Sequence, residues 1–244
     1  MPATKDAPIV FRGLYWAAST VASLISRKRC AGAEYIPQSG PALIVANHTS
    51  NYDTIALGDF IISHGRWPRF LGKSEIWKVP FIGWLARQAR QIPVERHTER
   101  AKDSLIHARE ALEAGDVVAI FPEGTITRDP TGWPMLARRG AARLALMTGV
   151  PVIPAAIKGA DAILGGRYLE LGKIFGDRER EVVVVAGPPV DLSDLPVTDE
   201  PSDEQIQEAT SRIMATITDM YSKLRGEPVP TKVWDPWLKD YTDR

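Results

Sequence analysis

Short apolar runs alternate with amphipathic segments along most of the chain. Apolar runs predict strands at residues 42–46, 70–72, 91–94, 117–121, 150–157 and 181–186, and a short strand and turn at 31–37. Apolar residues at helical spacing predict helices at residues 53–62, 98–114, 136–148 and 203–224. The run Val117–Phe121 is continuously apolar, which is typical of a strand covered on both faces. The pattern therefore predicts an α/β fold with a central, mostly parallel sheet flanked by helices.

The N-terminal segment combines an apolar stripe with aromatic and basic residues. Ile9–Ser26 is predicted to be an amphipathic helix, with Tyr15 and Trp16 beside its stripe and Arg27–Arg29 directly after it. Such a helix suits the headgroup layer of an anionic membrane. The alternative is a helix that packs on the protein core and leaves a basic end in solvent.

The segment from Lys73 to Arg87 mixes the same kinds of residue. Three aromatic residues are interleaved with three cations, namely Trp77, Phe81, Trp84, Lys73, Lys78 and Arg87. This mixture is typical of a surface that meets both acyl chains and phosphate groups. A pair of core helices whose cations extend to solvent would give the same pattern, and the sequence leaves both interpretations open.

Length and composition limit what the chain can be. We predict a membrane-contacting segment at residues 1–29, a main domain at 30–225 and a C-terminal tail at 226–244. A formal net charge of zero argues against nucleic acid as a partner. Cys30 is the only cysteine, which excludes an intrachain disulfide and indicates a reducing compartment. Without a run of about eighteen apolar residues or a secretory signal, we expect no membrane-spanning helix.

A histidine and an aspartate frame the turn after the predicted strand at 42–46. His48 lies in that turn, and Asp53 opens the following helix. A carboxylate at this position can accept a hydrogen bond from one ring nitrogen of His48, which fixes the tautomer and raises the basicity of the other nitrogen. A general base needs this arrangement. The alternative is that Asp53 only caps the helix and His48 is an ordinary loop residue.

Two further predicted strands also end in polar residues. Arg96 follows the strand at 91–94, and Glu123–Thr125 follows the strand at 117–121. Because ligands of open α/β sheets bind beyond the carboxyl ends of the strands, we expect these side chains near His48. Arg96 can grip a phosphate with its planar fork, although most arginines are simply exposed. Gly124 permits close approach of the backbone to a ligand.

Four segments in order resemble the motifs of the glycerolipid acyltransferases, specifically the bacterial 1-acyl-sn-glycerol-3-phosphate acyltransferases. Asn47–Asp53 is similar to the motif N-H-x-S-x-x-D, and the other three segments are Gln91–Arg96, Phe121–Thr125 and Val150–Pro154. The stretch between the first two motifs also resembles the family at Lys73 with Glu75 and at Pro80–Gly83. Four motifs in order over roughly residues 31–157 are much more specific than any one alone.

The resemblance implies that residues 30–225 are an acyltransferase domain. The implied reaction moves a fatty acyl group from acyl-CoA or acyl carrier protein to the sn-2 hydroxyl of 1-acyl-glycerol 3-phosphate, a lysophospholipid acceptor, and gives phosphatidic acid. No cofactor beyond this co-substrate and no metal is implied. The implied setting is the membrane surface at the cytoplasmic face of the cell membrane, with the protein peripheral or monotopic. The implied catalytic residues are His48 and Asp53, and the implied substrate-binding residues are Arg96, Glu123, Gly124, Thr125 and Lys73.

Two departures from the family bear on the acceptor. Arg90 stands where the second motif usually has glycine, and Leu136–Gly140 keeps basic residues but lacks the aromatic residue and the lysine that often follow the third motif. The same chemistry on glycerol 3-phosphate, another lysophospholipid or a glycolipid therefore stays open, as does a non-enzymatic lipid-binding module. A hydrolase fits poorly, because the chain has no G-x-S-x-G elbow and no paired histidines at metal-binding spacing.

Overall fold

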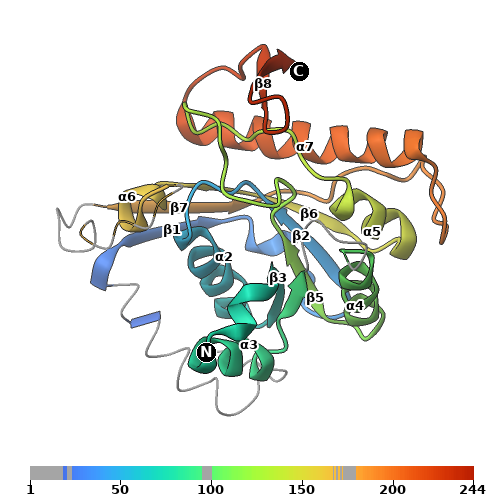
Figure 1. Cartoon of the computed structure of the whole chain (residues 1–244), viewed down its shortest axis with the longest axis horizontal. Coiled ribbons are helices and arrows are strands. Elements are labelled where there is room, and N and C mark those ends of the chain that lie inside the picture. The colour runs from blue at the N-terminus through green and yellow to red at the C-terminus, as the bar shows by residue number, and fades with distance from the viewer. Residues whose placement is uncertain are drawn as a thin grey trace.

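The computed structural model describes residues 19–20, 24–94, 101–166, 168, 170, 172 and 180–244, without the side chains of 101–104. Its centre is a seven-stranded sheet with helices on both faces (Figure 1). The strand order is β1-β7-β6-β2-β5-β3-β4, and all neighbours are parallel except β6 and β7. The predicted α/β fold with a mostly parallel sheet is confirmed.

The elements follow one another in the alternating order that the sequence predicts. The strands of the large sheet are β1 (Arg27–Ala31), β2 (Ala42–Ala46), β3 (Pro68–Lys73), β4 (Ile92–Val94), β5 (Val117–Ile120), β6 (Val152–Lys158) and β7 (Glu181–Ala186). The α-helices are α2 (Tyr52–Ser63), α3 (Pro80–Gln88), α4 (Ala101–Glu113), α5 (Gly140–Thr148), α6 (Asp161–Leu164) and α7 (Asp203–Arg225). Two 3-10 helices are η1 (Ala33–Tyr35) and η2 (Ser74–Lys78), and a hairpin of β8 (Lys232–Asp235) and β9 (Asp240–Asp243) follows α7.

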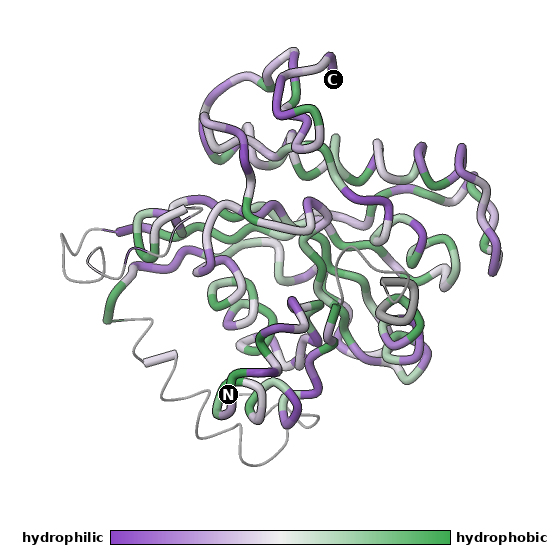
Figure 2. The backbone as a smooth tube through the Cα atoms, viewed as in Figure 1, coloured by the Kyte–Doolittle hydropathy of each residue, from purple (hydrophilic) through white to green (hydrophobic). Residues whose placement is uncertain are grey.

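β2 runs through the middle of the core, and all five of its residues are buried. Ile44 and Ala46 pack in the hydrophobic cluster that includes α2, whereas Leu43 and Val45 pack in the cluster that includes α4, α5 and α7. Figure 2 shows the hydrophobic residues concentrated in these central strands. A strand that is covered on both faces has no polar side, which explains why residues 42–46 are apolar without alternation.

Four parallel strands bring their carboxyl ends to one edge of the sheet. Val45 of β2 is in register with Ile120 of β5, and the chain also pairs β5 with β3 and β3 with β4 in parallel. The turns that follow β2, β5 and β3 therefore emerge side by side. This edge holds the first and third sequence motifs, as the pattern of polar strand ends predicts.

The first strand corrects one prediction. β1 begins at Arg27, where the sequence predicted the basic end of a helix, and it pairs with β7 at the edge of the sheet. Lys28 forms an ion pair with Asp59 of α2, and Arg29 forms one with the first residue of β7. The basic cluster is therefore part of the sheet and not a helix end.

The neighbouring predictions shift accordingly. The strand predicted at 31–37 is replaced by the end of β1 and the helix η1, and the predicted boundary between residues 29 and 30 falls inside β1. The amphipathic helix predicted at 9–26 lies mostly outside the described residues.

The segment between β3 and β4 is exposed. Phe81 is 66% exposed and Trp84 is 42% exposed, so the interpretation of this segment as core helices is wrong. Among the helices that the structure describes, none is both long and apolar enough to cross a membrane.

The C-terminal tail folds back on the main domain, above α7 in Figure 1. Val233 of β8 is buried, and the N–H of Leu136 donates to the carbonyl of Trp234 at 3.0 Å. The Arg244 guanidinium donates to the Thr218 hydroxyl of α7 at 3.2 Å. The hairpin therefore holds the loop that precedes α5.

Candidate active site

His48 and Asp53 form a hydrogen-bonded pair at the carboxyl end of β2. The Nδ1 atom of His48 lies 3.0 Å from Oδ2 of Asp53. The same carboxylate accepts main-chain N–H groups from Thr49 at 2.6 Å and Ser50 at 2.7 Å. Because these donors hold Asp53 as an acceptor, Nδ1 carries the proton and Nε2 of His48 is left as the basic nitrogen. The predicted histidine–carboxylate contact is present in the structure.

Asp53 is fully buried at the start of α2, whereas the His48 side chain keeps 14% of its surface exposed. Burial raises the pKa of Asp53, and the hydrogen bonds from His48, Ser50 and Thr49 oppose that rise. The carboxylate is thus shielded from water while the imidazole stays accessible. A buried carboxylate that orients an accessible imidazole is the arrangement expected of a general base.

Packing fixes the plane of the imidazole ring. Phe121 stacks on His48 with ring centroids 4.1 Å apart and an angle of 14° between the planes. Before the turn, the Asn47 side-chain amide exchanges two hydrogen bonds with the main chain of Ile157 in β6, at 2.8 and 2.9 Å. The turn that carries His48 is therefore anchored to β6 on one side and to the end of β5 on the other.

The sequence predicted that Glu123 faces the site. In the structure it lies behind His48 instead. Its Oε1 accepts the main-chain N–H of His48 at 2.8 Å, and its Oε2 accepts that of Met135 at 3.1 Å. The side chain is buried, and it is not part of the cavity wall. Burial raises the pKa of Glu123 to about 8, against the opposing effect of these two N–H donors. In the structure Glu123 links the first motif to the loop before α5.

An apolar cavity of about 800 Å³ begins at His48 and extends along β3 and α5. This volume is within the range of small-molecule sites. Its walls also include residues of β5, η2, α3 and α4. The polar and charged residues of the described wall are His48, Asn51, Thr54, Lys73, Gln91, Thr125, Arg138 and Arg143. The described wall thus holds three cations and no carboxylate.

The structure brings most of the predicted site residues to this cavity. Lys73, Gly124 and Thr125 line it together with His48. Arg96 lies outside the described residues. In the part of the chain that the structure describes, no group of three or more His, Cys, Asp and Glu side chains could hold a metal ion.

Sequence reasoning did not assign Arg138 and Arg143 to the site. Arg138 stood out only as part of a basic segment after the third motif, and Arg143 had no signal beyond its charge. Both line the cavity. A spacing of five residues is not one that helical periodicity brings to one face, so only the fold shows that both lie in the cavity wall.

Comparison with known proteins identifies the family. Residues 27–158 match the acyltransferase family, which is more than half of the 244 residues. The chain belongs to the acyltransferase family. All four sequence motifs fall inside the matched residues, so the resemblance predicted from the motifs is confirmed at the level of the family.

Two curated relatives and one solved structure extend this result. The acyltransferase is 34% identical over 135 residues to a chloroplastic 1-acyl-sn-glycerol-3-phosphate acyltransferase of Brassica napus. The aligned residues cover 54% of this chain and 38% of that one. It is 26% identical over 191 residues to the 1-acyl-sn-glycerol-3-phosphate acyltransferase of Bacillus subtilis, covering 78% of this chain and 86% of that one.

The fold is also that of a solved structure, the 1-acyl-sn-glycerophosphate acyltransferase from Thermotoga maritima. The two chains share a TM-score of 0.64 and 24% sequence identity over 91% of this chain and 82% of the other. The acyltransferase spans between about a third and half of the length of the first curated relatives that it matches.

Proposed function

We propose that this acyltransferase transfers a fatty acyl group from a thioester, acyl-CoA or acyl carrier protein, to the sn-2 hydroxyl of 1-acyl-glycerol 3-phosphate. The product is phosphatidic acid, made for phospholipid biosynthesis. The observation that carries the proposal is the buried Asp53 behind His48 at one end of an apolar cavity whose described wall is cationic. The names of the relatives from Brassica napus and Bacillus subtilis support the same acceptor.

The chemical step needs a base and no acyl-enzyme. Nε2 of His48 takes the proton of the acceptor hydroxyl as its oxygen attacks the thioester carbonyl. The ester C–O bond forms, the C–S bond breaks, and the proton passes from His48 to the leaving thiolate. Asp53 keeps the imidazole in the required tautomer and stabilises its positive charge, as the orienting carboxylate does in a serine hydrolase.

The oxyanion of the tetrahedral intermediate needs N–H donors near the third motif. The N–H of Gly124 already donates to the carbonyl of Phe121 at 2.9 Å. The next main-chain N–H groups, those of Thr125 and Ile126, belong to residues of the cavity wall and are our candidates.

For the acceptor, we assign Lys73 and Arg96 to the phosphate, and the turn at Gly124 and Thr125 to the glycerol. Lys73 supports this assignment because it lines the cavity and its ion pair with Glu75 is long, at 3.5 Å, and half-exposed. Such an exposed ion pair contributes little to stability, so Lys73 can leave Glu75 and bind a phosphate instead. The apolar remainder of the cavity suits an acyl chain.

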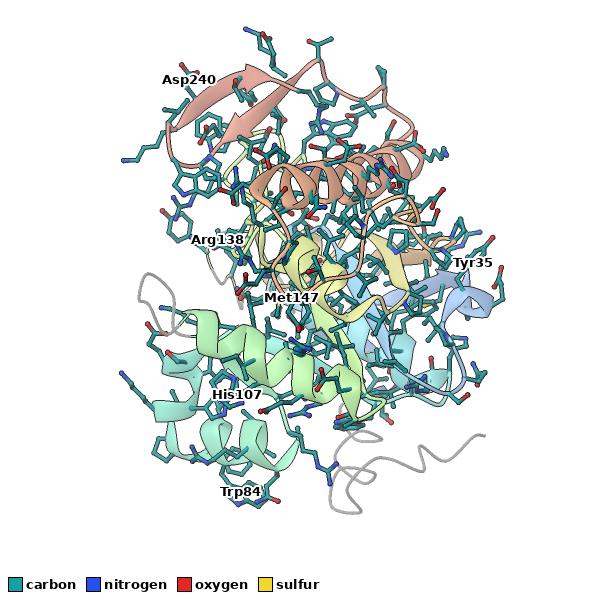
Figure 3. All side chains as sticks on the ribbon, turned by 90° about the vertical axis from the view of Figure 1, so that its right-hand side faces the viewer. Tyr35, Trp84, His107, Arg138, Met147 and Asp240 are labelled. Carbon is teal, nitrogen blue, oxygen red and sulfur yellow. The ribbon has the colours of Figure 1, made fainter. Side chains whose placement is uncertain are left out.

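We further propose that the exposed apolar residues of α3 rest on the membrane at its cytoplasmic face. Phe81 and Ile82 are 66% and 50% exposed, and Lys78 and Arg87 are exposed cations of the same segment. Trp84 lies at the outer end of the molecule in Figure 3. Because Trp77 and Ala86 of the same segment line the cavity, a lipid could enter it directly from the bilayer.

One experiment tests the reaction and its base together. Purified protein is incubated with labelled acyl-CoA and one acceptor in each of three parallel reactions. The acceptors are 1-acyl-glycerol 3-phosphate, glycerol 3-phosphate and lysophosphatidylcholine, and the regiochemistry of each product is determined. We expect turnover with the first acceptor and a loss of about 10²–10⁴-fold in kcat for His48→Ala. Residual activity above a tenth of wild type in a folded variant contradicts the role of His48.

His107 provides the matched control. It also pairs with a carboxylate, that of Glu110 at 3.2 Å, but both side chains are more than half exposed on α4 (Figure 3). His107→Ala should leave kcat within twofold of wild type. Turnover that is faster with another acceptor would overturn the assigned substrate and keep the chemistry, and liposome binding without any turnover would support a lipid-binding module.

A further inference from the structure

Arg138 and Arg143 are two cations of the cavity wall. The part of the chain that the structure describes provides no hydrogen bond or ion pair to either guanidinium. Arg138 is exposed just before α5, and Arg143 is half-buried on α5. A guanidinium is a weakly hydrated cation that forms charge-assisted hydrogen bonds, so each of the two gains free energy from an anion that enters the cavity.

The third motif fixes the position of Arg138. The N–H of Arg138 donates to the carbonyl of Pro122 at 2.8 Å, which fastens the start of α5 to the turn after β5. Gly124 has a φ of 72°, and a Cβ atom built on it would lie 2.7 Å from Cδ and 2.8 Å from Nε of Arg138. The arginine side chain therefore lies directly on the glycine, in space that a larger residue would take.

The adjacent arginine shows that this placement is specific. Arg139 forms an ion pair with Asp203 at the start of α7, at 3.2 Å, and does not line the cavity. Of two neighbouring exposed arginines, one is thus paired with a carboxylate outside the cavity, and the other lines the cavity without an ion pair to any described residue. Arg139 is the natural control for its neighbour.

We propose that Arg138 and Arg143 bind the phosphate group of the acceptor and make the site selective for a phosphomonoester. This inference rests on the proposed function and deepens it. A phosphomonoester carries up to two negative charges and three free oxygens, which suits two forked guanidinium donors. Together with Lys73, the described wall holds three cations and no carboxylate.

The acceptor phosphate fits this site better than the phosphate of the thioester donor. In 1-acyl-glycerol 3-phosphate, the phosphate is on the carbon next to the one that carries the reacting hydroxyl, so it must bind close to His48. Arg138 meets that requirement through two contacts. Its side chain lies on Gly124, and Glu123, the residue before Gly124, accepts the main-chain N–H of His48 at 2.8 Å. In the donor, the whole pantetheine chain separates the thioester from the nearest phosphate.

The test compares Arg138→Gln, Arg143→Gln, Arg138→Lys and the control Arg139→Gln. KM is measured for short-chain 1-acyl-glycerol 3-phosphate at saturating acyl-CoA, and for acyl-CoA at saturating acceptor. We expect each glutamine variant at positions 138 and 143 to raise the acceptor KM roughly tenfold to a hundredfold and to leave the donor KM within twofold. Arg138→Lys should restore part of the affinity, and Arg139→Gln should change neither KM. Equal melting temperatures would confirm that the variants are folded.

A second measurement separates this inference from the proposed function. Binding of labelled 1-acyl-glycerol 3-phosphate is measured by equilibrium dialysis without any donor. If wild type binds this lipid, the glutamine variants at 138 and 143 lose binding, and no protein turns over, the inference stands and the proposed reaction fails. If turnover occurs but the acceptor KM is unchanged, the inference fails and the reaction stands. A rise in the donor KM alone would assign the site to the donor phosphate and overturn the inference.

Discussion

At the scale of the residue, a buried carboxylate determines what the imidazole can do. Oδ2 of Asp53 accepts three hydrogen bonds at once, from the His48 ring and from the main chain of Thr49 and Ser50. These bonds offset part of the cost of burying a charge. They also remove the freedom of the carboxylate to rotate, so the histidine tautomer is set before any substrate arrives.

Replacing Asp53 with asparagine should abolish this control. In Asp53→Asn the amide would present a donor where acceptors are required, and the ring proton of His48 would move to Nε2, which removes the base. We expect kcat to fall by about 10²–10⁴-fold with an acceptor KM within threefold of wild type. The measurement is kcat/KM against pH, since a loss of packing alone would leave the shape of the wild-type pH profile intact.

Glu123 should make the stability of the fold depend on pH. Its pKa is raised to about 8 by burial, from an ordinary value of 4.5, so the folded state keeps a proton that the unfolded state has released. The contribution of Glu123 to stability is therefore complete below about pH 4.5 and is lost as the pH rises through about 8, by at most about 5 kcal/mol. We expect the free-energy cost of Glu123→Gln to shrink steadily between pH 5 and pH 8.

Urea unfolding of wild type and Glu123→Gln at several pH values measures this difference. At pH 5 the glutamine should be destabilising, because its amide cannot accept both the His48 and the Met135 N–H groups. Taking the difference between the two proteins removes the contribution of Asp53 and other titrating groups. A difference that stays constant from pH 5 to pH 8 would show that Glu123 is ionised throughout.

The sequence predicted the base and its carboxylate partner, but it placed Glu123 among the substrate-binding residues, whereas the structure places it behind His48. His48 and Asp53 are five residues apart at a strand–helix junction, so local pattern is sufficient to pair them. Glu123 instead bonds to residues 75 positions before and 12 positions after it. Contacts of that range depend on strand order, which a hydrophobic pattern does not encode.

At the scale of the element, prediction was most accurate where the hydrophobic pattern was strongest. β2 was predicted with its bounds, and α7 within one residue of its end. α7 also has a complete capping box at Ser202 and Gln205. β1 was not predicted, because Arg27–Ala31 is mostly charged and becomes a strand only through its pairing with β7.

Two other elements show how distant contacts override local pattern. α5 was predicted from Leu136 but begins at Gly140, since Leu136 and Arg138 donate their N–H groups to Trp234 and Pro122 and not to a helix. The prolines of the predicted strand at 150–157 predicted a strand end or edge. Pro151 does lie just before β6, but Pro154 lies inside it, and β6 is internal. Pro154 is tolerated there because the ladder with β7 starts only at the next residue, so its missing N–H breaks no bond of that ladder.

The element that the sequence left undecided, α3, supports a test of membrane contact. The double variant Phe81→Ser/Trp84→Ser should bind vesicles that contain anionic lipid at least tenfold more weakly than wild type, because each side chain is expected to bury much of its apolar surface in the bilayer. Sedimentation with vesicles gives the partition coefficient. The acyltransferase activity on short-chain, monomeric acceptor should change by less than threefold.

Trp237 on the hairpin is the control for α3. It is 57% exposed, more than Trp84, but the hairpin of β8 and β9 lies at the opposite end of the molecule from α3 (Figures 1 and 3). Trp237→Ser should leave vesicle binding unchanged. Equal losses from both ends would mean that exposed aromatic area, and not the position of α3 beside the cavity, governs binding.

At the scale of the whole molecule, the hairpin and the cavity are joined by the loop between the third motif and α5. That loop contains Met135, whose N–H reaches Glu123, and Leu136, whose N–H reaches the hairpin. Arg138 of the cavity wall follows Leu136 by two residues. A segment at the C-terminus therefore supports a wall of the site without contributing a residue to it.

Deletion of residues 227–244 should thus weaken both stability and acceptor binding. It removes the burial of Val233, the bond from Leu136 and the contact of Tyr241 with Asp129. A loss of about 2–3 kcal/mol from this burial lowers Tm by about 4–12 °C in a domain of this size. Because the loop before Arg138 loses its hydrogen bond to the hairpin, we expect the acceptor KM to rise severalfold while the donor KM stays within twofold.

Leu238→Ala, at an exposed position of the same hairpin, is the control. A truncated protein with wild-type Tm and acceptor KM would show that the hairpin does not support the site.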